Sequence, residues 1–267
     1  MRDHSGRSML LFCVFIMAFF TFSSKNFARE ITEIDVKDFN IPHPSSESLG
    51  ELKWLWATYY YTPTYVSKSE GFPLLDMDGL ELGPRLSHRE WCISALEGST
   101  AIRYQGELVV YNFAGFGEQL QVDCSKYYKY TKSGKIRFRL AEGPYGDGAG
   151  ETRYILFPYR TIAVDPRVIP FGTLIYIPDA RGIKVSLKSG KKFTHDGYFF
   201  AADKGGAIKG VHIDVFEGVE KVPAFEKFVK SNPKGKFKAF ILKNESLRFL
   251  VEQAHYKESG ILVPGEF

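Results

Sequence analysis

The chain has 267 residues, with 35 Lys and Arg against 31 Asp and Glu, for a net charge of +4. Hydrophobic residues make up 44% of it, an ordinary globular composition that excludes a fully disordered protein. The mild charge, with no dense basic stripe in the body of the chain, excludes a dedicated nucleic-acid-binding protein. Three Cys are too few for a miniprotein framed by disulfides.

The first 28 residues have the pattern of an export signal. Arg2 and Arg7 precede an apolar run over residues 9–22, which is short for a membrane-spanning helix and typical of a secretory signal. The cleavage site is poorly defined. Residues 1–28 are therefore predicted to be either a signal peptide or an uncleaved N-terminal anchor, and the body of the protein is expected to be exported.

The first part of the body is predicted to hold a linker, one strand and one helix. Residues 29–50 are polar and contain prolines and a serine run, which indicates a linker. The aromatic stretch from Leu52 to Tyr61 predicts a strand, and the glycines and prolines over residues 66–84 indicate an irregular connection. The pattern Ser-His-Arg-Glu at residues 87–90 is a capping box that opens a short helix, which Gly98 ends.

Short strands separated by glycine turns are predicted for most of the remaining chain. They are expected at residues 100–104, 107–113, 120–122, 135–140, 154–164, 174–177, 197–202, 211–216 and 236–243, with a loop at 141–150, a short helix at 223–230 and a terminal helix that Asn244 caps. Strands dominate without an alternating strand–helix rhythm. The predicted fold class is therefore mainly β: a closed or partly closed barrel with an inserted β-rich subdomain and short peripheral helices.

Two cysteines, Cys92 and Cys124, belong to the body of the protein. Outside the cytoplasm they can form a disulfide. Because the sequence does not give their separation in space, a bonded pair and two buried thiols stay equally open.

Asp214 is the strongest candidate for chemistry. In the strand at residues 211–216 the odd, apolar positions are expected to face the core, so that His212, Asp214 and Phe216 share the opposite face. A carboxylate beside an aromatic ring on a partly covered face is desolvated, which raises its pKa and lets it act as a general acid near neutral pH. The alternative is a solvated aspartate on an outward face.

Asp203 ends the strand at residues 197–202. The following Gly205-Gly206 pair lets the backbone bend sharply and offer N–H groups to a ligand or to the carboxylate. Lys209 supplies a cation that could keep Asp203 ionised. The alternative is a strand-end turn in which Asp203 bonds its own backbone.

The other polar patterns favour structural roles. Asp165 precedes Pro166, which biases it to an extended conformation, and it is expected to cap the following turn. The pair His195-Asp196 is expected to form a turn. The six His are scattered without a metal-binding motif, and the chain contains neither a G-x-S-x-G elbow nor a phosphate loop. No metal and no cofactor are predicted.

Three strings of the sequence form a set. Residues 163–173 read AVDPRVIPFGT, residues 202–216 read ADKGGAIKGVHIDVF, and residues 57–63 read ATYYYTP. The first two look like the two halves of the three-aspartate (3D) domain, in the right order and spacing. The third is similar to the first barrel strand of the membrane-bound lytic transglycosylase A (MltA) family. Together the resemblance covers roughly residues 52–64 and 160–243.

The resemblance implies a particular architecture. The fold would be a double-psi β barrel, built from residues 51–65 plus 160–245 as the catalytic domain. Residues 66–159 would form the inserted β-rich subdomain, and residues 246–267 a C-terminal helix and tail. The length falls short of a full-size family member, which implies a reduced substrate groove.

The resemblance also implies a function: a peptidoglycan lytic transglycosylase. Such an enzyme cleaves the bond from N-acetylmuramic acid to N-acetylglucosamine without water and leaves 1,6-anhydro ends. The family's catalytic acid and base falls on Asp214, which differs from the usual two-carboxylate glycosidase. The residues implied to contact the glycan are Asp203, Thr58, Tyr60, Gly206, Lys209 and Asp165. The implied setting is a monomer acting on peptidoglycan strands in the periplasm or cell envelope, with membrane tethering and secretion both open.

One departure and one alternative accompany this reading. Lys204 stands where many relatives carry Thr, so a hydroxyl contact to the glycan would be lost. Barrels of the expansin and barwin type also resemble the second string, including an Asp in a His-x-Asp context, and some bind wall glycans without cleaving them. A noncatalytic glycan-binding module is therefore the alternative function.

Overall fold

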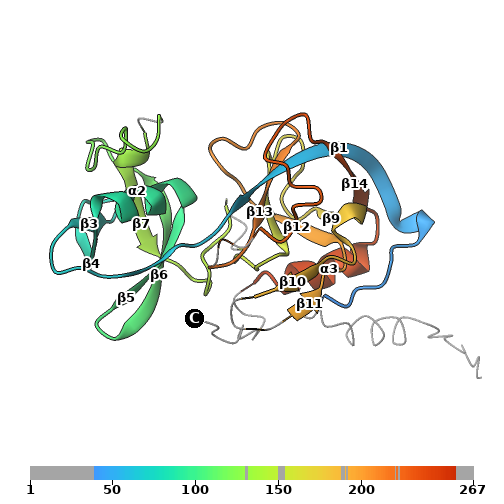
Figure 1. The fold of residues 1–267 in the computed structure, drawn as a ribbon, viewed down its shortest axis with the longest axis horizontal. Helices are drawn as coiled ribbons and strands as arrows, with labels where there is room; N and C mark the ends of the chain where they lie inside the picture. Colours follow the sequence, from blue (N-terminus) through green and yellow to red (C-terminus); the bar gives the residue numbers. More distant parts are fainter. Residues whose placement is uncertain are drawn as a thin grey trace, which may run out of the picture.

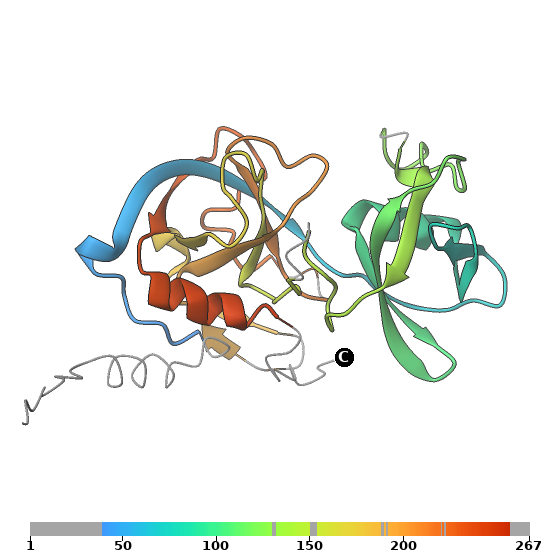
Figure 2. The same ribbon diagram turned by 180° about the vertical axis from the view of Figure 1, so that it is seen from behind.

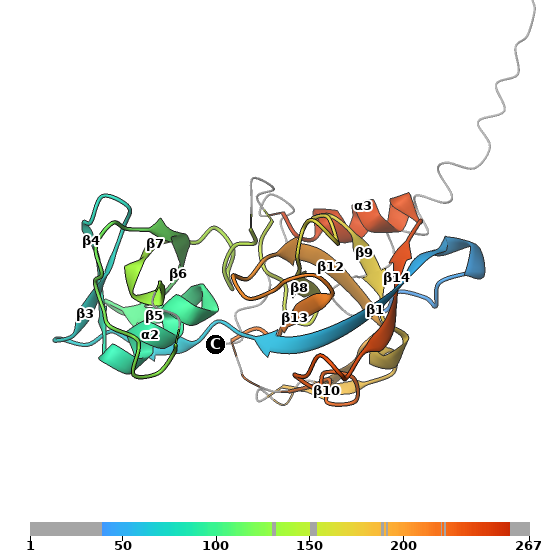
Figure 3. The ribbon, with the colours of Figure 1, turned by 90° about the horizontal axis from the view of Figure 1, so that it is seen from above.

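Two β-rich lobes lie side by side along the long axis of the molecule (Figure 1). The computed structural model describes residues 39–129, 132–149, 154–187, 190, 192–219, 221 and 223–256. One lobe is a closed barrel, and the other holds the strands between β1 (Leu49–Tyr60) and β8 (Thr161–Ala163) in the chain. β1 crosses the barrel and leads toward the second lobe, as Figure 3 shows from above. The prediction of a mainly β protein with short helices is confirmed.

The barrel is closed in the order β1, β13, β8, β12, β9, β14. Its remaining strands are β9 (Leu174–Tyr176), β12 (Tyr198–Asp203), β13 (His212–Phe216) and β14 (Phe237–Leu242). The pairs β1–β13 and β8–β12 are parallel, and the other neighbouring pairs are antiparallel. A closed barrel is therefore confirmed, while its double-psi connection remains a prediction.

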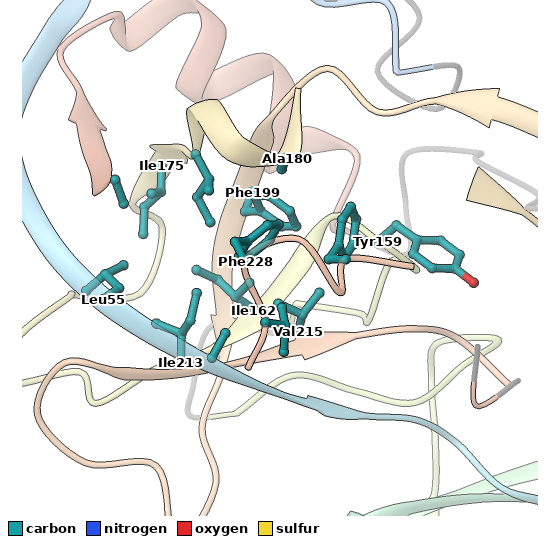
Figure 4. Packing of buried hydrophobic residues seen from close by; sticks show 14 of the residues in the cluster. Leu55, Tyr159, Ile162, Ile175, Ala180, Phe199, Ile213, Val215 and Phe228 are labelled. Atoms are coloured by element: carbon teal, nitrogen blue, oxygen red, sulfur yellow. The ribbon is translucent and has the colours of Figure 1, made fainter. Parts of the chain in front are cut away.

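The barrel interior is filled by apolar side chains from every part of its wall (Figure 4). Ile213 and Val215 of β13 are fully buried there, as the period-two pattern predicts, and they meet Leu55, Ile162, Ile175 and Phe199. Each such side chain contributes about 1.5–3 kcal/mol by leaving water. This packing fixes β13, so the opposite face of the strand is held in one orientation.

A buried ion pair lies beside this core. The Arg160 guanidinium donates to both carboxylate oxygens of Asp196, at 2.7 and 3.1 Å, and lies over the Phe39 ring. Asp196 also accepts hydrogen bonds from the backbone N–H groups of Ile41 and Tyr198. The predicted turn at His195-Asp196 is thus part of a buried polar network that ties the N-terminal segment to the barrel.

The second lobe is a four-stranded sheet with a hairpin and a helix. The sheet order is β2 (Thr64–Val66), β5 (Ser99–Tyr104), β6 (Glu107–Phe116), β7 (Ile136–Leu140), and β3 (Phe72–Leu75) pairs with β4 (Glu81–Leu86). Trp91 of helix α2 (His88–Glu97) packs on Phe138 of β7 in the lobe core. The structure joins Cys92 and Cys124 in a disulfide, one of the two alternatives the sequence left open.

Helix α2 begins and ends where its sequence predicts. Ser87 and Glu90 form the predicted capping box, each bonding the other's backbone N–H group. Gly98 adopts a left-handed φ of 84°, and its N–H group donates to the Ser94 carbonyl. The last helical residue is Glu97.

The remaining elements are short. Helix α3 (Glu245–Gln253), capped by Asn244 as predicted, packs its apolar side chains against the barrel and lies in front in Figure 2. β10 (Lys184–Ser186) pairs with β11 (Lys192–Thr194), and single 3-10 turns occupy η1 (Ser46–Ser48), η2 (Ser133–Lys135) and η3 (Pro178–Ala180).

Three predicted elements are wrong. The strand expected at 154–164 is limited to β8, because Pro158 and the left-handed Tyr159, with a φ of 60°, turn the chain before it. No strand forms at 120–122. The N–H groups of Gln121 and Val122 both donate to the Gly134 carbonyl, so they do not form the alternating hydrogen bonds of a strand pair. Residues 224–228 form a single turn rather than a helix, with the Phe228 and Val229 N–H groups both donating to the Phe225 carbonyl.

Two regions are more ordered than predicted. The connection at 66–84 contains β3 and β4, whose prolines are tolerated because the two strands pair only with each other. Phe39 and Ile41, expected in a linker, are buried against the barrel. The predicted export signal at 1–28 and the tail from residue 257 onward lie outside the described residues. Among those described, no helix is long and apolar enough to cross a membrane.

Candidate active site

Four neighbouring barrel strands bring one row of residues to the same level. Thr58 of β1 is paired with Asp214 of β13, and Asp214 is paired with Ala163 of β8. Ala163 in turn is paired with Asp203 of β12, after a register shift in that strand. Cross-strand partners are direct neighbours. The row therefore places both aspartates on one part of the barrel wall, with a small alanine between them.

Asp214 is partly buried and is held by Thr58, whose Oγ1 donates to Asp214 Oδ1 at 2.7 Å. Burial raises the pKa of Asp214 to about 7. The Thr58 hydrogen bond opposes this rise in pKa, while the negative charges of Glu97 and Asp203 add to it. A carboxyl group with a pKa near neutral can both give and take a proton at physiological pH.

Thr58 also contacts a histidine. Its Oγ1 lies 2.8 Å from His212 Nε2, and the His212 ring stacks on Trp56 with 3.5 Å between ring centroids. Burial lowers the pKa of His212, and the Ala207 carbonyl opposes that shift. The predicted sharing of one strand face by His212 and Asp214 is thus what lets both side chains meet Thr58.

Asp203 is a second acid with a raised pKa. Burial raises the pKa of Asp203 to about 6. The backbone N–H group of Lys204 donates to Asp203 Oδ1 at 2.8 Å and opposes this rise. The Tyr60 hydroxyl lies near this carboxyl, and it is buried without a well-formed hydrogen bond to any residue that the structure describes. The expectation that Lys209 keeps Asp203 ionised is wrong: Lys209 is exposed, and burial outweighs the cation that does act, Lys204.

The other predicted glycan contacts lie outside this row. Asp165 is buried, and its oxygens accept from the Arg167 guanidinium and from the Gly210 N–H group, which hold its pKa well below the usual range. These contacts match the capping role expected from its place before Pro166. Gly206 and Lys209 are exposed in the loop between β12 and β13, and no atom lies within 4 Å of a Cβ added at Gly206.

Glu97 is an acid near the site that the sequence analysis missed. It ends α2 in the second lobe, and its Oε2 accepts from the Tyr61 N–H group at 3.3 Å, just beyond β1. Burial raises the pKa of Glu97 to about 7. No local signal could have placed it here, because only the packing of the two lobes brings the end of α2 to β1.

Glu217 is the second missed acid and directly follows β13. The Ala224 N–H group donates to its Oε1 at 3.3 Å, while its buried Oε2 has no hydrogen-bond partner in the described part of the chain. Burial raises the pKa of Glu217 to about 8, and the charge of Asp214 adds to the rise. Glu217 is therefore protonated at neutral pH.

Glu217→Gln is expected to stabilise the protein at high pH. Because the folded-state pKa is raised, the wild type loses stability as the pH rises toward and through about 8, whereas glutamine stays neutral. The variant should gain roughly 2–4 kcal/mol at pH 9 and nothing at pH 4, measured by urea unfolding. Glu226→Gln, at an exposed position nearby, is the control and should change stability by less than about 0.5 kcal/mol. An equal gain at both pH values would contradict the assignment.

No group of three or more His, Cys, Asp or Glu side chains that could hold a metal ion occurs in the described ranges. The row carries the carboxyl groups of Asp214 and Asp203 and the hydroxyl group of Thr58, with the His212 imidazole beside Thr58, and groups of these kinds can transfer protons.

Residues 160–225 match the family model of the 3D domain. This match confirms the resemblance carried by the two long strings, and it covers β8 to β13, which contribute Ala163, Asp203 and Asp214 to the row. No curated protein matches the sequence.

Several solved structures are similar to this one. E. coli MltA with bound chitohexaose has a TM-score of 0.47 and 18% identity, with 71% of this chain and 72% of that chain covered. A membrane-bound lytic murein transglycosylase from Agrobacterium tumefaciens has a TM-score of 0.46 and 16% identity, with 73% of this chain and 76% of that chain covered. MltA from Neisseria gonorrhoeae has a TM-score of 0.42 and 14% identity, with 72% of each chain covered. At such identities the likeness concerns the course of the chain alone.

Proposed function

We propose that this protein is a peptidoglycan lytic transglycosylase that cleaves the β-1,4 bond from N-acetylmuramic acid to N-acetylglucosamine. The observation that carries the proposal is Asp214, a partly buried carboxyl group with a pKa near 7 on the outer side of the barrel core. The 3D-domain match over residues 160–225 supports it.

In the first step Asp214 acts as a general acid. Its proton passes to the bridging oxygen, the bond from that oxygen to C1 of the muramyl ring breaks, and the N-acetylglucosamine part leaves with a hydroxyl group. Positive charge develops on the muramyl ring, either as an oxocarbenium-like centre or shared with its acetamido group. The nearby Asp203 carboxylate, ionised above its pKa of about 6, stabilises that charge.

In the second step the Asp214 carboxylate acts as a base. It takes the proton of the C6 hydroxyl, whose oxygen bonds to C1 and closes the 1,6-anhydro ring. Asp214 recovers its proton, no water is consumed, and one carboxyl group serves both steps. General acid–base catalysis of this kind contributes typically 10²–10⁴-fold to a rate.

The remaining expectations extend this proposal. Thr58 orients Asp214, and the Gly206–Lys209 loop borders the glycan, while Asp165 supports that loop through Gly210. Tyr60, expected to contact the glycan, is buried against Phe216 and lies near Asp203 instead. Residues 51–65 plus 160–245 act as the catalytic barrel and residues 66–159 as an inserted subdomain. The protein works as an exported monomer in the cell envelope.

The test is digestion of purified peptidoglycan followed by mass spectrometry of the released fragments. Muropeptides ending in 1,6-anhydro-N-acetylmuramic acid are expected. Fragments with reducing ends would make the protein a hydrolase, and glycan binding without any product would make it the noncatalytic module. Either result overturns the proposal.

Glu97→Gln is expected to move the pH dependence of activity. The Glu97 charge helps to raise the pKa of Asp214, so its removal lowers that pKa. Because Asp214 must be protonated to act as an acid, the alkaline limb of the kcat/KM profile should move to lower pH by a few tenths of a unit. Glu118→Gln, at an exposed position in the same lobe, should leave the profile unchanged. A shift to higher pH would contradict the prediction.

A further inference from the structure

The Thr58 hydroxyl lies between two groups that compete for its hydrogen. Its Oγ1 is 2.7 Å from Asp214 Oδ1 and 2.8 Å from His212 Nε2. A hydroxyl group carries a single hydrogen and can donate it to one of these neighbours at a time. The other contact is then a good hydrogen bond only if that neighbour donates to Oγ1.

Which neighbour receives the Thr58 hydrogen depends on whether Asp214 is protonated. An ionised Asp214 has no hydrogen to offer, so Thr58 donates to it. A protonated Asp214 can donate from Oδ1 to Thr58, which frees the Thr58 hydrogen for Nε2 of a neutral His212. Burial keeps the His212 ring neutral by lowering its pKa, and the ring cannot turn freely because it is stacked on Trp56 with 8° between the ring planes.

We propose that His212 is a positioning residue for Asp214: its Nε2 accepts the Thr58 hydrogen while Asp214 is protonated and releases it when Asp214 loses its proton. The role rests on the proposed function. In the free protein the chain Asp214–Thr58–His212 holds the proton on the acid. When the carboxyl proton turns to the glycosidic oxygen, the hydroxyl swings back to Oδ1 and stabilises the carboxylate that forms. Thr58 and His212 each keep their own hydrogens throughout.

The neighbouring charges do not account for this coupling. The charged groups that act on Asp214 are Asp203 of β12 and Glu97 of α2. Neither is hydrogen-bonded to His212 in the described chain, and the His212 ring contacts Trp56 and Thr58 of β1 and the Ala207 backbone instead. A change at His212 can therefore reach Asp214 through the Thr58 hydroxyl while these charges stay in place.

The experiment is a 13C NMR titration of the Asp214 carboxyl group, which needs no enzyme activity. His212→Phe keeps a ring on Trp56 but removes the acceptor, so Thr58 donates permanently to Asp214 and favours its ionised form. The Asp214 pKa should fall by about 0.5–1 unit, as expected for one neutral hydrogen bond. His212→Gln, whose amide oxygen can accept, should restore most of the shift. The same change at an exposed histidine, His43→Phe, should leave the pKa unchanged.

A second background makes the result decisive. The Thr58→Val variant lacks the hydroxyl group that links His212 to Asp214. In that variant, His212→Phe should no longer change the Asp214 pKa. The proposal is overturned if His212→Phe leaves the pKa unchanged or raises it, or if it lowers the pKa equally in the Thr58→Val background. The titration does not depend on turnover. The role of His212 is therefore tested separately from the proposed function, even if the protein binds glycans without cleaving them.

Discussion

Asp214→Asn is expected to reduce the release of anhydromuropeptides from peptidoglycan by at least about 10³-fold. Asparagine keeps the shape of the side chain and can still accept the Thr58 hydrogen bond, but it has no proton to give to a glycosidic oxygen. Since one carboxyl group serves both proposed steps, neither step has a replacement. The measurement is the initial rate of product formation by liquid chromatography and mass spectrometry.

The matched control is Asp78→Asn, an exposed aspartate in the turn between β3 and β4, which should retain full activity. Loss of folding is excluded by a second measurement. The folded-state pKa of Asp214 is raised, so the wild type loses stability as the pH rises from about 4 toward 7, and the asparagine variant does not. Asp214→Asn should therefore be inactive and, at pH 8, more stable than the wild type. Substantial remaining activity would place the proton chemistry on another residue.

The face on which Asp214 lies could be predicted from the sequence, whereas its partners could not. Alternation along residues 211–216 assigns Ile213 and Val215 to the core and His212 and Asp214 to the opposite face. Pairing Thr58 with Asp214 joins two segments more than 150 residues apart, and no local pattern encodes such a register. Only the motif resemblance placed them in one site.

The errors at the site have a common physical cause. Lys209 was expected to hold Asp203 ionised because it is near in sequence, but a solvated cation acts weakly compared with burial. Glu97 and Glu217 carry no motif at all, and their raised pKa values arise from the packing of the second lobe and of the 217–224 turn. Burial is a property of the assembled fold, so sequence reasoning could name Asp214 and Asp203 but not Glu97 and Glu217.

Arg160→Met is expected to destabilise the barrel strongly. Arg160 and Asp196 are 1% and 4% exposed and form a two-point ion pair. Methionine retains an apolar stem beside Phe39 but leaves a buried carboxylate without its cation, which costs about 3–5 kcal/mol. For a chain of this size the melting temperature should fall by roughly 10 °C.

The control is Arg85→Met. Arg85 pairs with Glu81 at the surface of the β3–β4 hairpin, where an ion pair contributes about 0–1 kcal/mol, so a small change is expected. A loss as large as that of Arg160→Met would show that the length of the side chain matters more than the burial of its partner.

The pH dependence identifies the cause of the loss. In the wild type the Arg160 charge overcomes burial and lowers the pKa of Asp196, so this pair stabilises the fold above the unfolded pKa of about 4 and less as the pH falls. Without the cation, burial dominates and the Asp196 pKa rises. Protonation of Asp196 then removes the unpaired charge. The loss of stability relative to the wild type should therefore be smaller at pH 4.5 than at pH 7. A deficit that is the same at both pH values would mean that the loss comes from packing against Phe39, because only an unpaired carboxylate can be relieved by a proton.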